Sequence, residues 1–257
     1  MVTITIHGAN DAGDIVLSPD HCDPTKTQLS VYGFSGNDTI VISPVGNTGT
    51  VQVTINDVVM GTFTGVTGRI VVYGLGGNDN LQVSGSVKPQ TWLYGGEGND
   101  RLNAGNGSAV MLGGTGDDLM TGGSGRDIMI GGTGADRIVG NAGDDILIAG
   151  YTAYDDNEDA LCALMHAWNT ADSGSIGNYD ARVSAIRTGV GVAGDFALKT
   201  DGANQTVFAD NDADTLTGSA GYDLFFANLV ADDGGLLDKI TDLSSKTPET
   251  AADSDMA

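Results

Sequence analysis

Residues 95–148 read GGEGNDRLN, AGNGSAVML, GGTGDDLMT, GGSGRDIMI, GGTGADRIV and GNAGDDILI, six nine-residue units without a gap. The second unit carries Ala109 at its sixth position, and the other five carry Asp there. These sixth-position aspartates are Asp100, Asp118, Asp127, Asp136 and Asp145. The eighth position is apolar in every unit. A fixed short period of this kind predicts a repeat architecture in which each unit stacks on its neighbours.

Each unit divides into a turn of six residues and a strand of three. The glycines favour the turn because glycine adopts positive φ without steric cost. In the strand, side chains alternate between the two faces, so the eighth position points inward. Two units then complete one coil of 18 residues. The repeat therefore predicts a fold dominated by β-structure, a parallel β-roll or β-helix with one inward apolar side chain per strand.

Stacking brings the aspartates close together. Asp100, Asp118 and Asp136 fall on one edge of the roll, and Asp127 and Asp145 fall on the other. Neighbouring strands lie about 4.8 Å apart, and two carboxylates about 5 Å apart repel by roughly 3 kcal/mol at an effective dielectric constant of 20. A cation between the coils turns this repulsion into attraction. Carboxylate and carbonyl oxygens in a flexible glycine turn favour Ca²⁺ over Mg²⁺.

The six units resemble the RTX, or haemolysin-type, calcium-binding repeat GGxGxDxUx. The resemblance implies Ca²⁺ ions in the turns, bound by the sixth-position aspartates of adjacent coils and by backbone carbonyls. The implied carbonyl ligands are Gly95, Gly113, Gly122, Gly131 and Gly140. Because Ala109 lacks a carboxylate, we expect the site between Ala109 and Asp127 to be weak or empty. The alternative is a metal-free solenoid in which Asp only forms turns.

Similar units occur outside the block, at 33–41, 74–82, 209–217 and 218–226. The resemblance implies further ligands at Asp38, Asp79, Asp214 and Asp223. If the segment between the block and 209–226 loops out, Asp214 should lie near Asp136 and Asp223 near Asp145. Asp79 can share an edge with Asp100.

Three sets of residues complete the repeat pattern. Residues 9–17 form a degenerate unit that carries Asp14. The position before the Asp is occupied by Asn37, Asn78 and Asn99, which we interpret as turn formers because Asn tolerates left-handed backbone. Asp117 and Asp144 occupy the same position and are expected to face solvent.

The chain divides into five predicted regions. Residues 1–94 are rich in β-branched residues and predict a strand-rich, solenoid-like region with longer coils. Residues 95–150 are the core β-roll. Residues 151–194 predict a helical hairpin inserted in the roll, because Leu161, Leu164, Met165 and Trp168 follow helical spacing. Residues 195–243 return to strands and final repeats, and 244–257 read as a disordered polar tail.

Charge and composition exclude several classes of protein. The chain has 257 residues, 34 acidic against 11 basic, and a formal net charge of −23. Nucleic-acid binding needs a basic face that this chain does not predict. No apolar run is long enough for a membrane span. The two cysteines, Cys22 and Cys162, do not make a disulfide framework, and their pairing is left open. No signal peptide is visible at the start of the chain.

The pattern predicts a binding and structural protein that is not an enzyme. The histidines His7, His21 and His166 are not accompanied by a catalytic motif such as GxSxG or HExxH. Our preferred interpretation is an extracellular or cell-surface calcium-binding module that folds when Ca²⁺ binds and belongs to a larger protein. One alternative is an accessory folding or substrate-binding module of a secreted lipase, protease or polysaccharide epimerase. Another is a calcium-dependent filament or surface-layer subunit, so partners beyond calcium include a second copy or a cell-surface polysaccharide.

Overall fold

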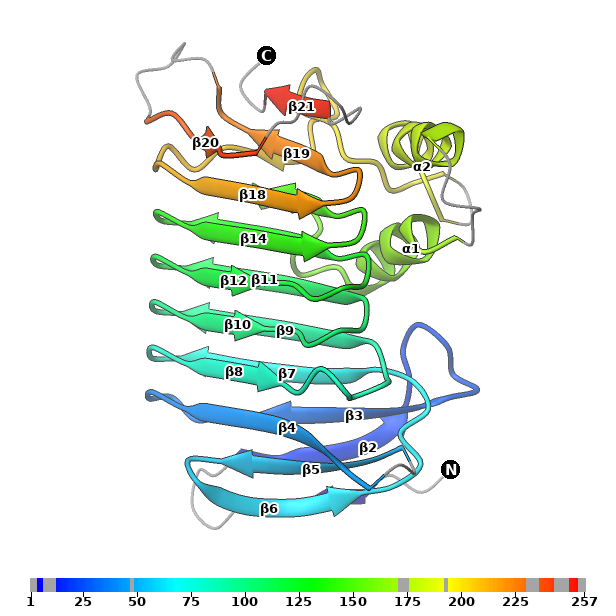
Figure 1. Cartoon of the computed structure of the whole chain (residues 1–257), viewed down its shortest axis with the longest axis vertical. Helices are drawn as coiled ribbons and strands as arrows, with labels where there is room; N and C mark the ends of the chain where they lie inside the picture. The colour runs from blue at the N-terminus through cyan, green and yellow to red at the C-terminus, as the bar shows by residue number, and fades with distance from the viewer. Residues whose placement is uncertain are drawn as a thin grey trace.

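The chain winds into a stack of coils that rises from the N-terminal to the C-terminal end (Figure 1). The computed structural model describes residues 4–6, 13–46, 49–170, 176–191, 194–229, 236–242 and 250–253. Within these residues, two large sheets face each other across the stack. A small antiparallel pair, β16 (Tyr151–Thr152) and β17 (Val207–Phe208), lies apart from them.

Ten strands make up the first large sheet. In spatial order they are β1 (Ile4–Ile6), β2 (Ile15–Pro19), β3 (Thr27–Tyr32), β7 (Ile70–Gly76), β9 (Thr91–Glu97), β11 (Ala109–Thr115), β13 (Ile128–Thr133), β15 (Ile146–Ile148), β19 (Leu224–Ala227) and β21 (Thr250–Asp253).

Nine strands make up the second large sheet. In spatial order they are β20 (Lys239–Ile240), β18 (Thr215–Ala220), β14 (Arg137–Ala142), β12 (Leu119–Thr121), β10 (Arg101–Asn103), β8 (Asn80–Val83), β4 (Thr39–Val45), β5 (Thr50–Ile55) and β6 (Val58–Phe63).

The strand register confirms the predicted parallel β-roll. Met111 pairs with Met129 in the ten-stranded sheet, and Leu102 pairs with Met120 in the nine-stranded sheet, each 18 residues further along the chain. The eighth-position side chains are fully buried between the sheets. The sheets therefore close on a continuous apolar core made of one residue from each strand of the repeat.

A second core lies outside the roll, on the other face of the ten-stranded sheet. Strand β11 buries Val110 and Leu112 there, while Met111 points into the roll. One side chain of each repeat strand points into the roll as predicted, and the strands of this sheet bury further side chains on their outer face. Because both faces of its strands are buried, they read as continuous apolar runs such as AVML, IMI and ILI.

The predicted helical hairpin covers this outer face. Helix α1 (Glu158–Trp168) begins at Asn157, whose side chain caps the Ala160 N–H, and α2 (Ile176–Thr188) follows. The apolar residues predicted from helical spacing in α1 are all buried, together with Tyr179 and Ile186 of α2. After the hairpin, β18 pairs with β14 and β19 with β15, so the insertion does not interrupt the stack.

The N-terminal end differs from the predicted longer solenoid coils. Of the first six strands, β1 to β6, only β3 and β4 join the parallel stack. Strand β3 pairs with β7, and β4 pairs with β8. The outer strands are antiparallel, in the order β1–β2–β3 on one sheet and β4–β5–β6 on the other. Residues 13–17, the described part of the unit at 9–17, are therefore not a coil of the roll, because β2 runs antiparallel to β3.

The C-terminal end also adds strands to the roll. Residues 250–253 fall within the predicted disordered tail, but they form β21 beside β19. The division of the chain into five regions stays a prediction. Both sheets run continuously past its boundaries at 94/95 and 194/195.

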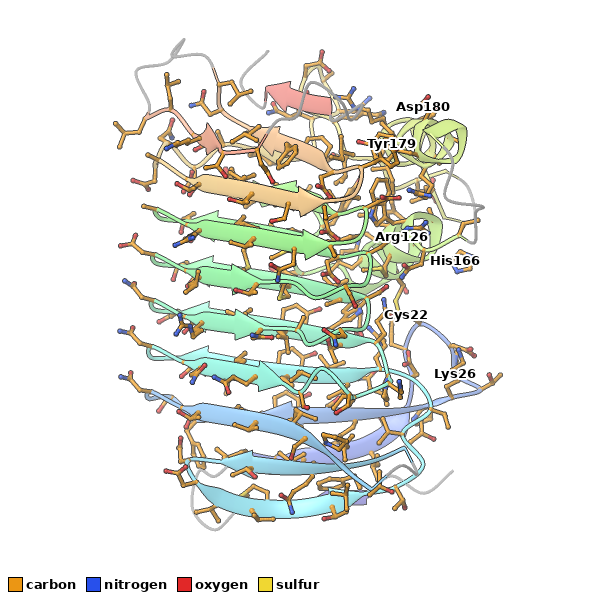
Figure 2. The ribbon with its side chains drawn as sticks, in the orientation of Figure 1. Cys22, Lys26, Arg126, His166, Tyr179 and Asp180 are labelled. Carbon is orange, nitrogen blue, oxygen red and sulfur yellow. A yellow bond between two sulfur atoms is a disulfide. The ribbon has the colours of Figure 1, made fainter. Side chains whose placement is uncertain are left out.

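Cys22 and Cys162 form a disulfide that joins the loop after β2 to α1. Beside it, the buried Arg69 guanidinium contacts the Asp20 carboxylate at 3.0 Å and the Glu158 carboxylate at 2.7 Å. The Arg69 guanidinium also stacks 4.1 Å from the centre of the Trp92 ring. Figure 2 shows His166 on the outer side of α1, where it is exposed. Neither helix is long and apolar enough to cross a membrane, as judged over the described residues.

Candidate metal sites

The sixth-position aspartates form two ladders on opposite edges of the roll. In the first ladder each Asp directly precedes a strand of the nine-stranded sheet, and in the second each precedes a strand of the ten-stranded sheet. The long ladder contains Asp38, Asp79, Asp100, Asp118, Asp136 and Asp214. The short ladder contains Asp127, Asp145 and Asp223.

One carboxylate oxygen of each ladder Asp ties adjacent coils together. Asp118 Oδ1 accepts a hydrogen bond from the backbone N–H of Asp100 at 2.7 Å, and Asp136 Oδ1 accepts one from Asp118 at 2.8 Å. The pattern extends to both ends of the long ladder, from Asp38–Asp79 to Asp136–Asp214. The short ladder repeats it, with Asp145 N–H donating to Asp223 Oδ1 at 2.9 Å. The predicted pairs 136–214, 145–223 and 79–100 are confirmed.

The second carboxylate oxygen, Oδ2, is buried without a hydrogen-bond partner at six ladder positions, among the residues that the structure describes. These positions are Asp79, Asp100, Asp118, Asp136, Asp145 and Asp214. A buried carboxylate oxygen without a partner is costly, because it has lost its water and gained nothing. Each of these oxygens therefore needs a cation or a proton.

The first glycine of each unit leaves room for this oxygen. A β-carbon on Gly95 would collide with Asp100 Oδ2 and with the carbonyl oxygen of Gly113. A β-carbon on Gly113 would collide in the same way with Asp118 Oδ2 and the Gly131 carbonyl oxygen. A carboxylate oxygen of one coil and a carbonyl oxygen of the next coil thus converge beside each of these glycines. Two oxygens placed together in this way form part of a coordination shell for a hard cation.

Burial raises the pKa of the ladder carboxyls, because the charged form loses its hydration. The pKa of Asp79 rises to about 6, those of Asp100 and Asp118 to about 7, and that of Asp136 to about 8. Burial also raises the pKa values of Asp127, Asp145 and Asp214. Repulsion adds to burial, as from Asp100 on Asp118. The carboxyls of the metal-free ladders therefore retain protons at a higher pH than exposed aspartates do.

The donor set fits calcium. The oxygens are carboxylates and carbonyls, which are the ligands that Ca²⁺ prefers. No three His, Cys, Asp or Glu side chains gather as a metal cluster in the described part of the chain, so an ion would depend on backbone carbonyls for much of its shell. Asp20 shows the contrast. It is equally buried, but the Arg69 guanidinium supplies its positive charge at 3.0 Å.

Three positions depart from the common geometry. Asp38 Oδ2 accepts from Phe34 N–H at 2.5 Å and Asp127 Oδ2 accepts from Gly123 N–H at 3.0 Å, so both oxygens are already bonded. Ala109 donates its N–H to Asp127 Oδ1 at 2.7 Å but brings no carboxylate of its own. The weaker site expected beside Ala109 stays a prediction.

The five predicted carbonyl ligands do not all have the same surroundings. The carbonyl oxygens of Gly95, Gly113 and Gly131 lie beside the ladder oxygens of the preceding coil, and that of Gly140 lies beside the short ladder. The Gly122 carbonyl instead accepts a hydrogen bond from the Asn141 side chain at 2.8 Å. The ligand roles of these residues and of the ladder aspartates stay predictions.

Sequence reasoning missed one member of the long ladder. Asp238 Oδ1 accepts a hydrogen bond from Asp214 N–H at 2.9 Å, which continues the pattern into β20. Residues 238–240, Asp-Lys-Ile, keep the Asp and the apolar residue two positions later. This spacing was the available signal, but the glycines that normally precede it are displaced.

The residues beside the ladder aspartates behave in two ways. Asn78 and Asn99 form a hydrogen-bonded ladder of turn residues, in which Asn99 N–H donates to Asn78 Oδ1 at 3.0 Å, and Asp117 is exposed in the same row. Asp144, expected in solvent, is instead partly buried and bonds Arg182 of α2. The hairpin explains the difference, because it docks over that turn.

A comparison with family models identifies these repeats. The model described as RTX calcium-binding nonapeptide repeat (4 copies) matches residues 92–111, 121–150 and 200–232. The units at 33–41 and 74–82 lie outside the match, although the structure stacks them in the same ladder. A search of the curated proteins and a search of the solved structures found no match.

Proposed function

We propose that this chain, which carries RTX calcium-binding nonapeptide repeats, is an extracellular structural module that folds when Ca²⁺ fills the turns of its two aspartate ladders. The observation that carries this proposal is the set of six buried Oδ2 atoms without a partner. Calcium, when bound, supplies the positive charge and the extra ligand bonds that these oxygens lack. The protein supplies two rows of prepositioned oxygens.

The ladder residues hold the turns in place for the ion. Oδ1 of each Asp is bonded to the neighbouring coil, so Oδ2 is fixed in direction. Without a cation, the charged ladders repel along the whole roll, and the negative charge opposes folding. Binding free energy is therefore available as folding free energy, as in other domains whose metal sites do not exist in the unfolded chain.

One feature supports an extracellular setting. The Cys22–Cys162 disulfide suits an oxidising compartment, because cytosolic thiols are kept reduced. Extracellular modules bind Ca²⁺ at about 10⁻⁴–10⁻³ M, and we expect the affinity of this chain to fall in that range. The larger parent protein and the accessory and filament alternatives stay predictions.

The test is a calcium titration followed by circular dichroism, with Mg²⁺ as a second metal. We expect β-structure to form with Ca²⁺ and not with equal Mg²⁺. Asp118→Asn removes one ladder charge and should weaken the apparent calcium affinity severalfold. Asp117→Asn is the matched control, because Asp117 is adjacent and exposed, and it should leave the titration unchanged. A complete β-spectrum in EGTA, or equal effects of the two variants, would contradict the proposal.

A further inference from the structure

The nine-stranded sheet presents a surface unlike the rest of this acidic chain. The chain contains 34 acidic residues, but the nine strands of this sheet contain none. Its outward side chains include three exposed cations, Arg101, Arg137 and Lys239. This sheet faces the viewer in Figure 1, and neither described helix lies over it.

The three cations form a regular row along the roll. The strand register places five residues side by side on successive strands. In order along the roll they are Arg101, Leu119, Arg137, Thr215 and Lys239. Cationic and uncharged residues therefore alternate from coil to coil. Since neighbouring strands lie about 4.8 Å apart, the charges repeat about every 10 Å along the axis.

The row is available to a partner. Arg101, Arg137 and Lys239 make no ion pair with any other residue that the structure describes, whereas Arg69, Arg182 and Lys26 are paired. Each cation follows a ladder aspartate, whose Oδ1 is bonded to the neighbouring coil. Cations without an ion-pair partner, on a sheet face that neither described helix covers, make this face complementary to an anion.

A groove of about 620 Å³ lies beside the row. The residues that line it are all uncharged, and its amide and hydroxyl side chains include Gln82, Asn103, Asn106, Thr121, Ser124 and Asn141. Gln82, Asn103 and Thr121 are aligned by the strand register, two residues after the row that contains Arg101. Amides and hydroxyls in a shallow groove can exchange hydrogen bonds with the hydroxyl groups of a sugar polymer.

We propose that this face binds a linear acidic polysaccharide in which charged and uncharged sugars alternate. The polymer lies along the roll axis, with its acidic groups on Arg101, Arg137 and Lys239 and its hydroxyls toward the groove. The wide spacing argues against a nucleic-acid duplex, in which each strand carries a phosphate about every 3.4 Å along the axis, so most of its charges would be unmatched. The groove borders the short ladder, because Gly122 and Gly123 line it, but the row of cations contains no predicted calcium ligand, and the proposal goes beyond the proposed function.

The experiment measures binding of the calcium-loaded, folded protein to hyaluronan, with neutral dextran and oligo(dT) as comparison probes. We expect binding to hyaluronan that weakens as salt rises, and none to dextran. The triple variant Arg101→Gln, Arg137→Gln, Lys239→Gln should weaken hyaluronan binding by roughly tenfold or more. Lys88→Gln, Arg187→Gln, Lys199→Gln is the matched control, with the same charge change outside this sheet, and should retain binding.

Circular dichroism in calcium first establishes that both triple variants are folded, which separates this test from the test of calcium-dependent folding. Equal weakening by the two triples would show a net-charge effect and overturn the proposal. Tighter binding to oligo(dT) than to hyaluronan, equal binding to dextran, or no binding to hyaluronan by the folded wild-type protein would overturn it as well.

Discussion

In the turns of this roll, contacts of individual oxygen atoms determine where glycine is required. In five of the six units of the block the first residue is glycine, because a side chain there would meet two oxygens, one from the Asp of the same unit and one from a carbonyl of the next coil. Positive φ explains other glycines, such as Gly114 and Gly116, but not this one. Close approach of oxygens to the backbone is the physical reason for the first glycine.

This reason predicts a difference between two glycine substitutions. Gly113→Ala places a methyl group against Asp118 Oδ2 and the Gly131 carbonyl oxygen. We expect it to lower the free energy of unfolding in calcium by about 1–3 kcal/mol, as overpacking does, and to weaken calcium affinity. The measurement is chemical denaturation at saturating Ca²⁺, paired with a calcium titration.

Gly36→Ala is the control. A β-carbon on Gly36 meets nothing within 4 Å, so we expect a change within about 0.5 kcal/mol. Equal destabilisation by both substitutions would mean that the oxygens beside Gly113 do not explain the effect.

The ladder is the unit that responds to pH. Burial raises the pKa of Asp79 to about 6 and of Asp136 to about 8 in the folded chain, whereas an exposed Asp has a pKa near 3.9. The folded, metal-free protein therefore binds more protons than the unfolded chain. Its stabilisation by protons is complete below about pH 4 and is lost as the pH rises through the raised values.

In EGTA we therefore expect the β-structure seen by circular dichroism to decrease as the pH rises from 5 to 8. In saturating Ca²⁺ the trend should flatten or reverse, because the ion binds the deprotonated carboxylates and competes with protons. Circular dichroism at several pH values, with and without calcium, provides the comparison. Parallel profiles in the two conditions would show that the ladder carboxyls do not exchange protons for calcium.

At the scale of the whole molecule, the helical hairpin and the N-terminal part of the chain are joined at one place. The disulfide links Cys22 to Cys162 of α1, and Arg69 binds carboxylates from both segments at Asp20 and Glu158. Helix α1 in turn buries the outer face of the ten-stranded sheet. The two cysteines are 140 residues apart in the sequence, and the loop that they close contains the whole repeat block, residues 95–148.

Opening this disulfide should destabilise the fold without abolishing calcium binding. We expect reduction to lower the free energy of unfolding by roughly 2–5 kcal/mol, because the unfolded chain regains the freedom of a long loop. Thermal unfolding in saturating calcium, with and without dithiothreitol, measures this. The double variant Cys22→Ser, Cys162→Ser is the control and should not respond to the reductant. A wild-type protein insensitive to reductant would contradict the role of the bridge.

The sequence alone was sufficient for the periodic part of this protein. Sixth-position Asp and eighth-position apolar residues predicted the two sheets, the two ladders and the stacking of Asp214 on Asp136, because a strict period leaves one way to stack the units. Only the tertiary structure paired Cys22 with Cys162, made the N-terminal strands antiparallel and drew Asp144 under α2. Those features depend on contacts between segments that do not share the repeat. The sequence period therefore does not predict them, and they are determined by which surfaces lie against each other in the folded roll.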